Sequence, residues 1–471
     1  MSSHIVMLCS PGLGHLIPFA ELAKLLASRH GFAITLFIPT IAGQPLQAIT
    51  NVFKKSNHHN IDYVILPPVN FDDLPLGTQP EVRICLAVTR SLGSLRDSLG
   101  SLASRAKVVA LVTDVFGQDA FEVAKEVGIS SYVYFMSAAM NLHFMLYLPT
   151  LHEEVKSEFR DMPNPICLPG CVPLHGRDFV DPVQDRASEG YNLILHYSKR
   201  ASLADGILLN SFTELEPGAI EALLTDEPRR PSVYPVGPII QSGSGGEPRE
   251  SMEYCLRWLD GQPSGSVLFV CFGSGGTLTN EQITELAYGL EMSGERFLWV
   301  VRSPDEKSSS GSYFSGQTRE DPFGFLPNGF LDRTVERGLL VPSWAPQIEV
   351  LSHPSTGGFL THCGWNSTLE SLTHGIPLIA WPLYAEQKSN AVMLSEGIKV
   401  AIRPKANQNG LIGRGEISRA IKSLMKEEEG LLIRSKAKEL GEAAKATLKK
   451  NGASTKMLKE VALKWRSEGH A

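Results

Sequence analysis

Segments with the pattern of buried strands alternate with segments of helical pattern along most of this chain. In the first half, the strand-like runs rich in β-branched residues are 4–9, 32–38, 61–66, 108–113 and 130–135. The amphipathic run after the first of them ends at Gly31, a residue suited to stop a helix. Strands that alternate with helices form parallel sheets covered on both faces. The pattern therefore predicts an α/β fold with a doubly wound sheet.

The alternation stops at the polar, glycine-rich stretch 241–251 and then starts again. The second run contains SVLFVCFGS, a helix predicted at 280–293 and RFLWVVR, and three helical segments close the chain at 414–428, 431–450 and 453–466. A polar insertion near 304–321 is predicted to be a surface loop. The pattern also weakens between 151 and 200, where CLPGCVPLHGRDF is predicted to be a long loop.

We therefore expect two Rossmann-like, doubly wound domains of similar size. The expected boundaries are 1–240 for the N-terminal domain, 241–252 for the linker, 253–450 for the C-terminal domain and 451–471 for a last helix. Packing of that helix against the N-terminal domain is one option.

Composition excludes several classes of function. The chain has 44 lysines and arginines against 50 aspartates and glutamates, which gives no basic surface for nucleic acid. The N-terminus has a short apolar run without a charged segment before it, unlike a signal peptide or a spanning helix. The 7 cysteines are scattered, as is typical of reduced thiols. We expect a cytoplasmic monomer with no membrane span and no metal site.

Two side chains mark the carboxyl edge of the first predicted sheet. His15 lies in the Gly-Leu-Gly-His turn after the first strand, and Asp114 follows the fourth strand. In the common strand order 3-2-1-4-5, these two strands flank the point where the winding reverses, and ligands bind there. A carboxylate that orients an imidazole makes a good general base. The alternative is that His15 only caps the turn and Asp114 only caps a helix.

Neither glycine-rich turn fits a better-known motif. The first lacks the third glycine of a dinucleotide-binding fingerprint, since Ile17 stands there, and this argues against an oxidoreductase. The second, at 272–276, begins with Phe272 and so is not the elbow of a serine hydrolase. Ser274 in this turn precedes a predicted helix, which favours a contact with phosphate.

The stretch 344–387 gathers polar and aromatic groups at the predicted strand ends of the second sheet. His362 follows a strand, and a helix is predicted to begin near Asn366, so its N–H groups form an anion site. One turn later Glu370 is placed to accept ribose hydroxyls, and Trp344 offers a face on which a base stacks. Each residue alone is as easily structural, but together they lie at one end of one sheet.

This stretch, from WAPQ through HCGWNS to AEQ, resembles the signature box of plant family-1 glycosyltransferases, and the whole chain is similar to that family. The segments FGSGGTLT, LPGCVPLHGRDF and PLYAEQK resemble its hydroquinone and phenolic glucosyltransferase group. The resemblance implies a GT-B fold with two domains facing across a cleft. It also implies UDP-glucose as co-substrate, no cofactor, and inverting transfer that gives a β-glucoside.

The resemblance also implies roles for particular residues. His15 would be the base that deprotonates the acceptor and Asp114 its partner. Trp344 would stack on uracil beside Gln347, and Glu370 would hold the ribose. Gln387, at the last position of the box, favours glucose over galactose. The full set implied to bind the donor is Ser274, Trp344, Ala345, Gln347, His362, Trp365, Asn366, Ser367, Glu370, Glu386 and Gln387.

The acceptor is the least constrained part of this interpretation. Candidates for its pocket are Glu81, Phe116, Met140, Asn141 and Phe144, mostly apolar side chains that suit a phenol, hydroquinone, monolignol or hydroxyindole. Such residues are also frequent in ordinary cores. Alternatives that stay open are a flavonoid acceptor, a nitrogen or sulfur nucleophile, a UDP-sugar epimerase or hydrolase, and a UDP-sugar binding protein without catalysis. No Asp-x-Asp lies near the predicted donor strands, in agreement with a metal-independent reaction.

Overall fold

The computed structural model describes residues 3–43, 46–54, 59–75, 77–225, 227–228, 230–242, 249–306 and 321–468. Most of the predicted insertion at 304–321 and half of the predicted linker at 241–252 lie outside these ranges. The chain forms two compact units, Met1–Gln241 together with Ala446–Ala471, and Ser242–Lys445. We call them unit 1 and unit 2.

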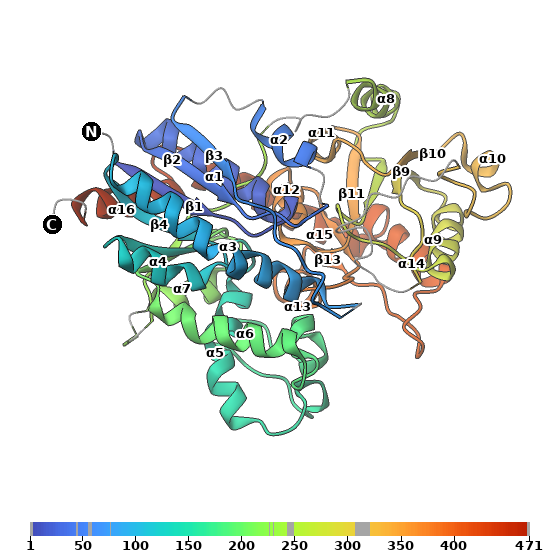
Figure 1. Ribbon diagram of the computed structural model, residues 1–471. Coiled ribbons are helices and arrows are strands. Elements are labelled where there is room, and N and C mark those ends of the chain that lie inside the picture. Colours follow the sequence, from blue (N-terminus) through green and yellow to red (C-terminus); the bar gives the residue numbers. More distant parts are fainter. Residues whose placement is uncertain are drawn as a thin grey trace. The chain divides into compact units, whose positions relative to one another are not determined.

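Unit 1 is built on a parallel sheet of 7 strands in the order β3-β2-β1-β4-β5-β6-β7. The predicted order 3-2-1-4-5 is therefore confirmed for the first five strands. Strands β1 to β4 are labelled in Figure 1. The strands are β1 His4–Leu8, β2 Ala33–Ile38, β3 Ile61–Ile65, β4 Val108–Thr113, β5 Ser130–Phe135, β6 Gly206–Leu209 and β7 Val233–Pro235.

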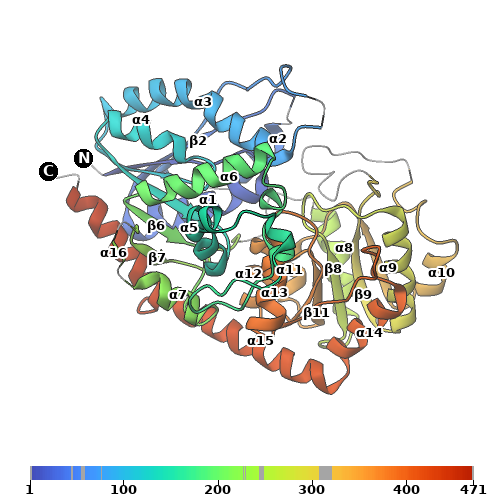
Figure 2. The ribbon, with the colours of Figure 1, turned by 90° about the horizontal axis from the view of Figure 1, so that it is seen from below.

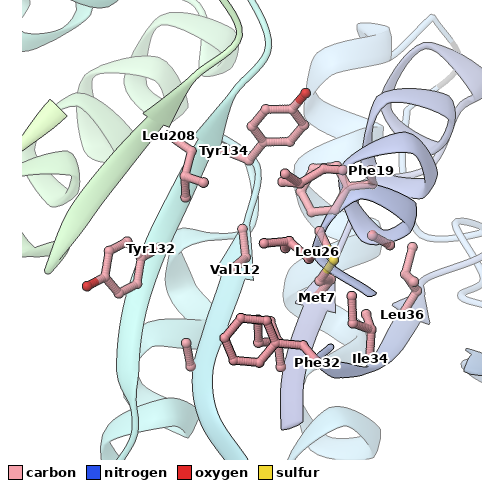
Figure 3. Packing of buried hydrophobic residues seen from close by; sticks show 14 of the residues in the cluster. Met7, Phe19, Leu26, Phe32, Ile34, Leu36, Val112, Tyr132, Tyr134 and Leu208 are labelled. Atoms are coloured by element: carbon pink, nitrogen blue, oxygen red, sulfur yellow. The ribbon is translucent and has the colours of Figure 1, made fainter. Parts of the chain in front are cut away.

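Helices cover both faces of this sheet. They are α1 Leu13–His30, α2 Leu46–Lys54, α3 Pro80–Ala103, α4 Phe121–Glu126, α5 Ala139–Glu154, α6 Glu189–Arg200, α7 Pro217–Leu224 and α16 Ala453–Glu468. On one face, Phe19 of α1 packs with Met7 and Tyr134 of the strands (Figure 3). On the other, α3 packs on alternate strand residues such as Leu8 and Leu111. Gly31 ends α1 in the left-handed region, at φ 65°, as predicted.

The stretch 151–200, where the sequence pattern is weak, contains the well-formed helix α6. The hydroxyl of Ser188 caps its first turn by accepting from the backbone N–H of Tyr191. Its buried side chains include Leu195 and Tyr197, but polar residues interrupt the apolar spacing. The predicted loop CLPGCVPLHGRDF is confirmed, since it holds only a short 3-10 turn, Gly176–Asp178, and one isolated bridge from Leu174 to Ile166.

The last helix, α16, packs in the core of unit 1. Trp465 has no exposed surface, and its ring lies edge-on to Tyr132 at 5.2 Å and to Phe32 at 6.0 Å. The helix contacts β4, β7 and α1 (Figure 2). The end of the chain, distant from β1 in sequence, is therefore part of the same core.

Replacement of Trp465 by alanine should lower the unfolding free energy of unit 1 by about 3–5 kcal/mol, because it removes a fully buried indole. Chemical denaturation followed by circular dichroism measures this change. Leu463→Ala, in the same helix at a position 52% exposed, is the matched control and should change it by less than about 1 kcal/mol. Equal effects of the two variants would contradict the packing of α16.

Unit 2 contains a second parallel sheet, of 6 strands in the order β10-β9-β8-β11-β12-β13. The strands are β8 Val267–Cys271, β9 Arg296–Val301, β10 Gly338–Pro342, β11 Thr356–Thr361, β12 Leu378–Ala380 and β13 Ala401–Ile402. The helices are α8 Arg249–Asp260, α9 Asn280–Ser293, α10 Phe330–Thr334, α11 Gln347–Ser352, α12 Trp365–Thr373, α13 Gln387–Val392, α14 Arg414–Met425 and α15 Glu428–Thr447. Helices α9 and α14 lie side by side (Figures 1 and 2).

Local signals explain the ends of α9, which match the prediction. The hydroxyl of Thr279 caps the helix by accepting from the N–H of Gln282, and Gly294 ends it at φ 72°. The predicted ends of α14 and α15 are wrong by about three residues. Gly430 does not break the helix but lies in the first turn of α15, where an added Cβ would come 2.3 Å from the carbonyl oxygen of Ser423.

Within the described ranges, no helix is long and apolar enough to span a membrane.

Candidate active site

The structure brings His15 and Asp114 together at the carboxyl edge of the unit 1 sheet. Strands β1 and β4 are neighbours, and both side chains lie just beyond their ends. The Nδ1 atom of His15 is 2.9 Å from Oδ2 of Asp114. The imidazole is 19% exposed, whereas the carboxylate has no exposed surface. Because the carboxylate accepts from Nδ1–H, the other ring nitrogen, Nε2, is the atom left to take a proton.

Further donors fix the Asp114 carboxylate. Ser10 donates its backbone N–H and its hydroxyl, each at 2.8 Å, and the N–H of Phe116 donates at 3.1 Å. Sequence reasoning missed Ser10, although its place just after β1 was a usable signal. A buried carboxylate with this many donors is fixed in one orientation, so it holds the ring of His15 in one orientation as well.

Phe116, one of the candidate acceptor residues, contacts both members of the pair. Its ring centroid is 5.6 Å from that of His15 and 6.3 Å from that of Tyr197 on α6. The phenylalanine is only partly buried. Phe116 therefore offers an apolar face beside the imidazole, which suits a flat aromatic molecule.

The other candidate acceptor residues lie on two helices. Met140, Asn141 and Phe144 belong to α5 and are all buried. Phe144 packs on Phe179 with centroids 4.7 Å apart, in the manner of a core residue. Glu81, in the first turn of α3, is partly buried, and burial raises the pKa of its carboxyl. The assignment of these four residues to an acceptor pocket stays a prediction.

In unit 2, strained backbone marks the carboxyl edge of the sheet. Ser343, Cys363 and Ala385 have φ angles of 63°, 65° and 56°, although none is glycine. Each adjoins a predicted donor residue, namely Trp344, His362 and Glu386. Left-handed backbone at non-glycine residues costs energy, and such strain is concentrated at functional sites.

His362 lies closely packed between two glycines. A Cβ atom added to Gly273 would come 2.5 Å from the imidazole, and one added to Gly364 would come 2.4 Å from it. Burial, and then the nearby charge of Arg302, lowers the pKa of His362 to about 4. The ring is therefore neutral at physiological pH, and it can give a ligand a hydrogen bond but no positive charge.

Helix α12 begins at Trp365, one residue before the predicted start, and carries a buried polar cluster. The Nε2 atom of Gln347 donates to Oγ of Ser367 at 2.9 Å and to Oε2 of Glu370 at 2.6 Å. Burial raises the pKa of Glu370 to about 7, against the opposing effect of the Gln347 hydrogen bond. The cluster places a carboxylate and a hydroxyl on one face of the helix.

The side chain of Gln387, the last residue of the predicted box, is hydrogen-bonded to nearby backbone groups. Oε1 of Gln387 accepts from the N–H groups of Leu383 and Tyr384, at 2.9 and 3.0 Å, which fixes the orientation of the side-chain amide. Asn390, a residue missed by sequence reasoning, donates to the carbonyl of Cys363 at 3.0 Å. It thereby ties α13 to the turn that follows His362.

The remaining predicted donor residues differ in exposure. Trp344 and Asn366 are partly buried, whereas Ala345 and Trp365 are 4% and 3% exposed. Ser274 is exposed, and its carbonyl oxygen accepts from Nη1 of Arg302 at 2.7 Å. Arg302, the last residue of RFLWVVR, is a further residue that sequence reasoning missed.

Comparison with known proteins identifies the family. Residues 249–429 match the model of the family described as UDP-glucoronosyl and UDP-glucosyl transferase. The chain is 53% identical to a hydroquinone glucosyltransferase of Rauvolfia serpentina over 465 residues, which cover 99% of this chain and 98% of that protein. The chain belongs to the plant family-1 UDP-glycosyltransferases.

Solved structures of similar proteins support the same placement of this glycosyltransferase. One is Phytolacca americana UGT2 complexed with UDP-2-fluoro-glucose and pterostilbene, with a TM-score of 0.90 and 54% identity over 98% of this chain and 99% of that one. Another is a Polygonum tinctorium UDP-glucosyltransferase capable of glucosylating indoxyl, with a TM-score of 0.91 and 51% identity over 99% of both chains. The predicted GT-B fold and the predicted place near the phenolic glucosyltransferase group are confirmed. The protein is an enzyme of UDP-sugar transfer.

Proposed function

We propose that this glycosyltransferase transfers glucose from UDP-glucose to the hydroxyl of a small aromatic acceptor and releases UDP and a β-D-glucoside. The observation that carries the proposal is the 2.9 Å contact between His15 and Asp114, whose fully buried carboxylate accepts several further hydrogen bonds. A UDP-sugar binding protein has no need of such a base, whereas a hydrolase would use it to activate water, so a requirement for an acceptor separates a transferase from a hydrolase. The names of the similar proteins, one acting on hydroquinone and another on indoxyl, support an aromatic acceptor.

In the proposed reaction, Nε2 of His15 takes the proton of the acceptor hydroxyl. The acceptor oxygen attacks the anomeric carbon of glucose as the bond to the β-phosphate oxygen breaks, so the configuration inverts in one step. Asp114 stabilises the imidazolium that forms. The partly buried ring of Phe116, 5.6 Å from His15, offers a surface for the acceptor ring.

The donor would be held by unit 2. Trp344 stacks on uracil. The Glu370 carboxylate, oriented by Gln347, accepts hydrogen bonds from the ribose hydroxyls. The N-terminus of α12 and the neutral ring of His362 bind the diphosphate. The amide oxygen of Gln387 is engaged with backbone N–H groups, so its N–H group is the one that donates to a glucose hydroxyl.

The test is UDP release from UDP-glucose across a panel of hydroquinone, a monolignol, a hydroxyindole, a flavonol and an aromatic amine. We expect UDP only when an acceptor is present, with the small phenols as the better substrates. Rapid UDP release without any acceptor would indicate a hydrolase instead. UDP-galactose, run in parallel, should react more slowly, and a preference for it would contradict the role of Gln387.

The cofactor requirement and the oligomeric state of the enzyme are tested separately. We propose that it needs no cofactor beyond UDP-glucose and acts as a cytoplasmic monomer. Activity should be unchanged in excess EDTA, and the active species should elute at the mass of one 51.4 kDa chain in size-exclusion chromatography.

A further inference from the structure

Arg302 lies at the donor edge of unit 2, directly after β9. This strand lies between β8 and β10, so Arg302 lies between the turn of Ser274 and that of Trp344. Its Nη1 atom donates to the carbonyl of Ser274 at 2.7 Å. Its Nε atom is buried and has no hydrogen-bond partner, and no carboxylate in the described ranges forms an ion pair with it.

The charge of Arg302 influences other residues of the proposed donor site. After burial, it is the second cause that lowers the pKa of His362 after β11, and it opposes the rise that burial produces in the pKa of Tyr384 after β12. The turn of Gly273 and Ser274 joins these groups, because Gly273 lies against the His362 ring and Ser274 is bonded to the guanidinium. Arg302, Ser274 and His362 thus surround one region at the ends of β8, β9 and β11.

A diphosphate in that region requires positive charge that the other assigned residues do not supply. Ser274, Asn366 and Ser367, which the resemblance to the family assigns to the diphosphate together with His362, are neutral groups, and His362 is neutral because its pKa is about 4. Each phosphate of UDP-glucose carries a negative charge, and departure of the sugar leaves one more on the β-phosphate. A partly desolvated guanidinium has the charge and the planar fork of N–H donors that phosphate binds best.

We propose that Arg302 is a diphosphate-binding residue of this enzyme and offsets the charge that develops on the UDP leaving group. This inference rests on the proposed use of UDP-glucose. It assigns the positive charge at the leaving group to a residue outside the signature box. In the transition state the electron pair of the breaking bond goes to the β-phosphate oxygen, and the fixed cation stabilises it there.

Binding of UDP and UMP by calorimetry tests the assignment, because only UDP carries the β-phosphate. We expect Arg302→Gln to weaken UDP about 10- to 100-fold and UMP less than about threefold. Glutamine keeps an N–H donor for the Ser274 carbonyl but removes the charge. Arg302→Lys keeps the charge and should retain an intermediate preference for UDP. The turnover number with UDP-glucose should fall in the same order.

Arg337 provides a matched control at the opposite edge of the same sheet. It precedes β10, its Nε is likewise buried without a partner, and its Nη2 donates to the backbone carbonyl of Glu291 at 3.2 Å. Arg337→Gln should leave the ratio of UDP to UMP affinity unchanged.

Three outcomes separate the possibilities. An unchanged ratio in Arg302→Gln overturns the role of Arg302. Equal loss of UMP and UDP in that variant also overturns it, because Arg302 would then act only through the Ser274 turn. A wild-type protein that binds neither nucleotide overturns the proposed function itself.

Discussion

Replacement of His15 by alanine will lower the turnover number about 10²- to 10⁴-fold, the range typical of losing a general base. The Michaelis constant for UDP-glucose should change little, because His15 and the donor residues belong to different units. Asp114→Asn should also be slow, since an amide no longer stabilises the imidazolium and favours the wrong tautomer of the ring. Initial rates of glucoside formation with saturating acceptor measure both effects.

The chain contains a control for this experiment. His196 forms a similar pair with Asp119, with Nε2 and Oδ1 2.9 Å apart, but the histidine is 48% exposed. His196→Ala should retain activity within about twofold, because exposed pairs contribute little. Full activity in His15→Ala would remove His15 as the base. Equal losses of activity in the two histidine variants would show that removal of either histidine–carboxylate pair disturbs unit 1 as a whole.

Replacement of Glu370 by glutamine will make the folded protein more stable at pH 8 and will weaken its binding of the donor. The pKa of Glu370 is raised to about 7 in the folded protein, from an ordinary value of 4.5, chiefly by burial. The folded state without ligand therefore binds this proton more tightly than the unfolded state does. This contribution is complete below pH 4.5 and is lost as the pH rises through about 7.

The wild-type unfolding free energy should thus fall by up to about 3 kcal/mol across that window through this group. Glu370→Gln removes the fall and should be more stable than the wild type at pH 8. Its affinity for UDP should be about 10- to 100-fold weaker there, because a neutral amide replaces the carboxylate that accepts the ribose hydroxyls. The wild-type affinity should rise from pH 6 to pH 8, whereas that of the variant should stay level.

Thermal unfolding and UDP titration at several pH values check both halves of this prediction. Glu396→Gln, at an exposed position of unit 2, is the control and should follow the wild type in both measurements. A Glu370→Gln variant that binds UDP as well as the wild type at pH 8 would exclude this carboxylate from the ribose site. A variant with the wild-type pH dependence of stability would show that Glu370 ionises normally.

The order of the elements and the family were accessible from the sequence because both depend on local patterns. Apolar period, Gly31 at a helix end and Thr279 before α9 act over a few residues, so they predict strands and helices without knowledge of the rest. Parallel alternation then restricts the strand order, which is why His15 and Asp114 were expected at one edge. The short motifs of the box are specific enough to indicate the family.

The electrostatic state of the site was decided only by tertiary structure. Whether Glu370 titrates near 7 and His362 near 4 depends on how much water is removed from each, and residues far along the chain remove it. The same holds for Ser10 on Asp114 and for Arg302 beside Ser274, contacts of 2.8 and 2.7 Å between segments that follow separate strands. The sequence by itself determined which groups reach the edges of the two sheets. Only the folded structure decided their charge and their partners, because desolvation and hydrogen bonding depend on packing between distant segments.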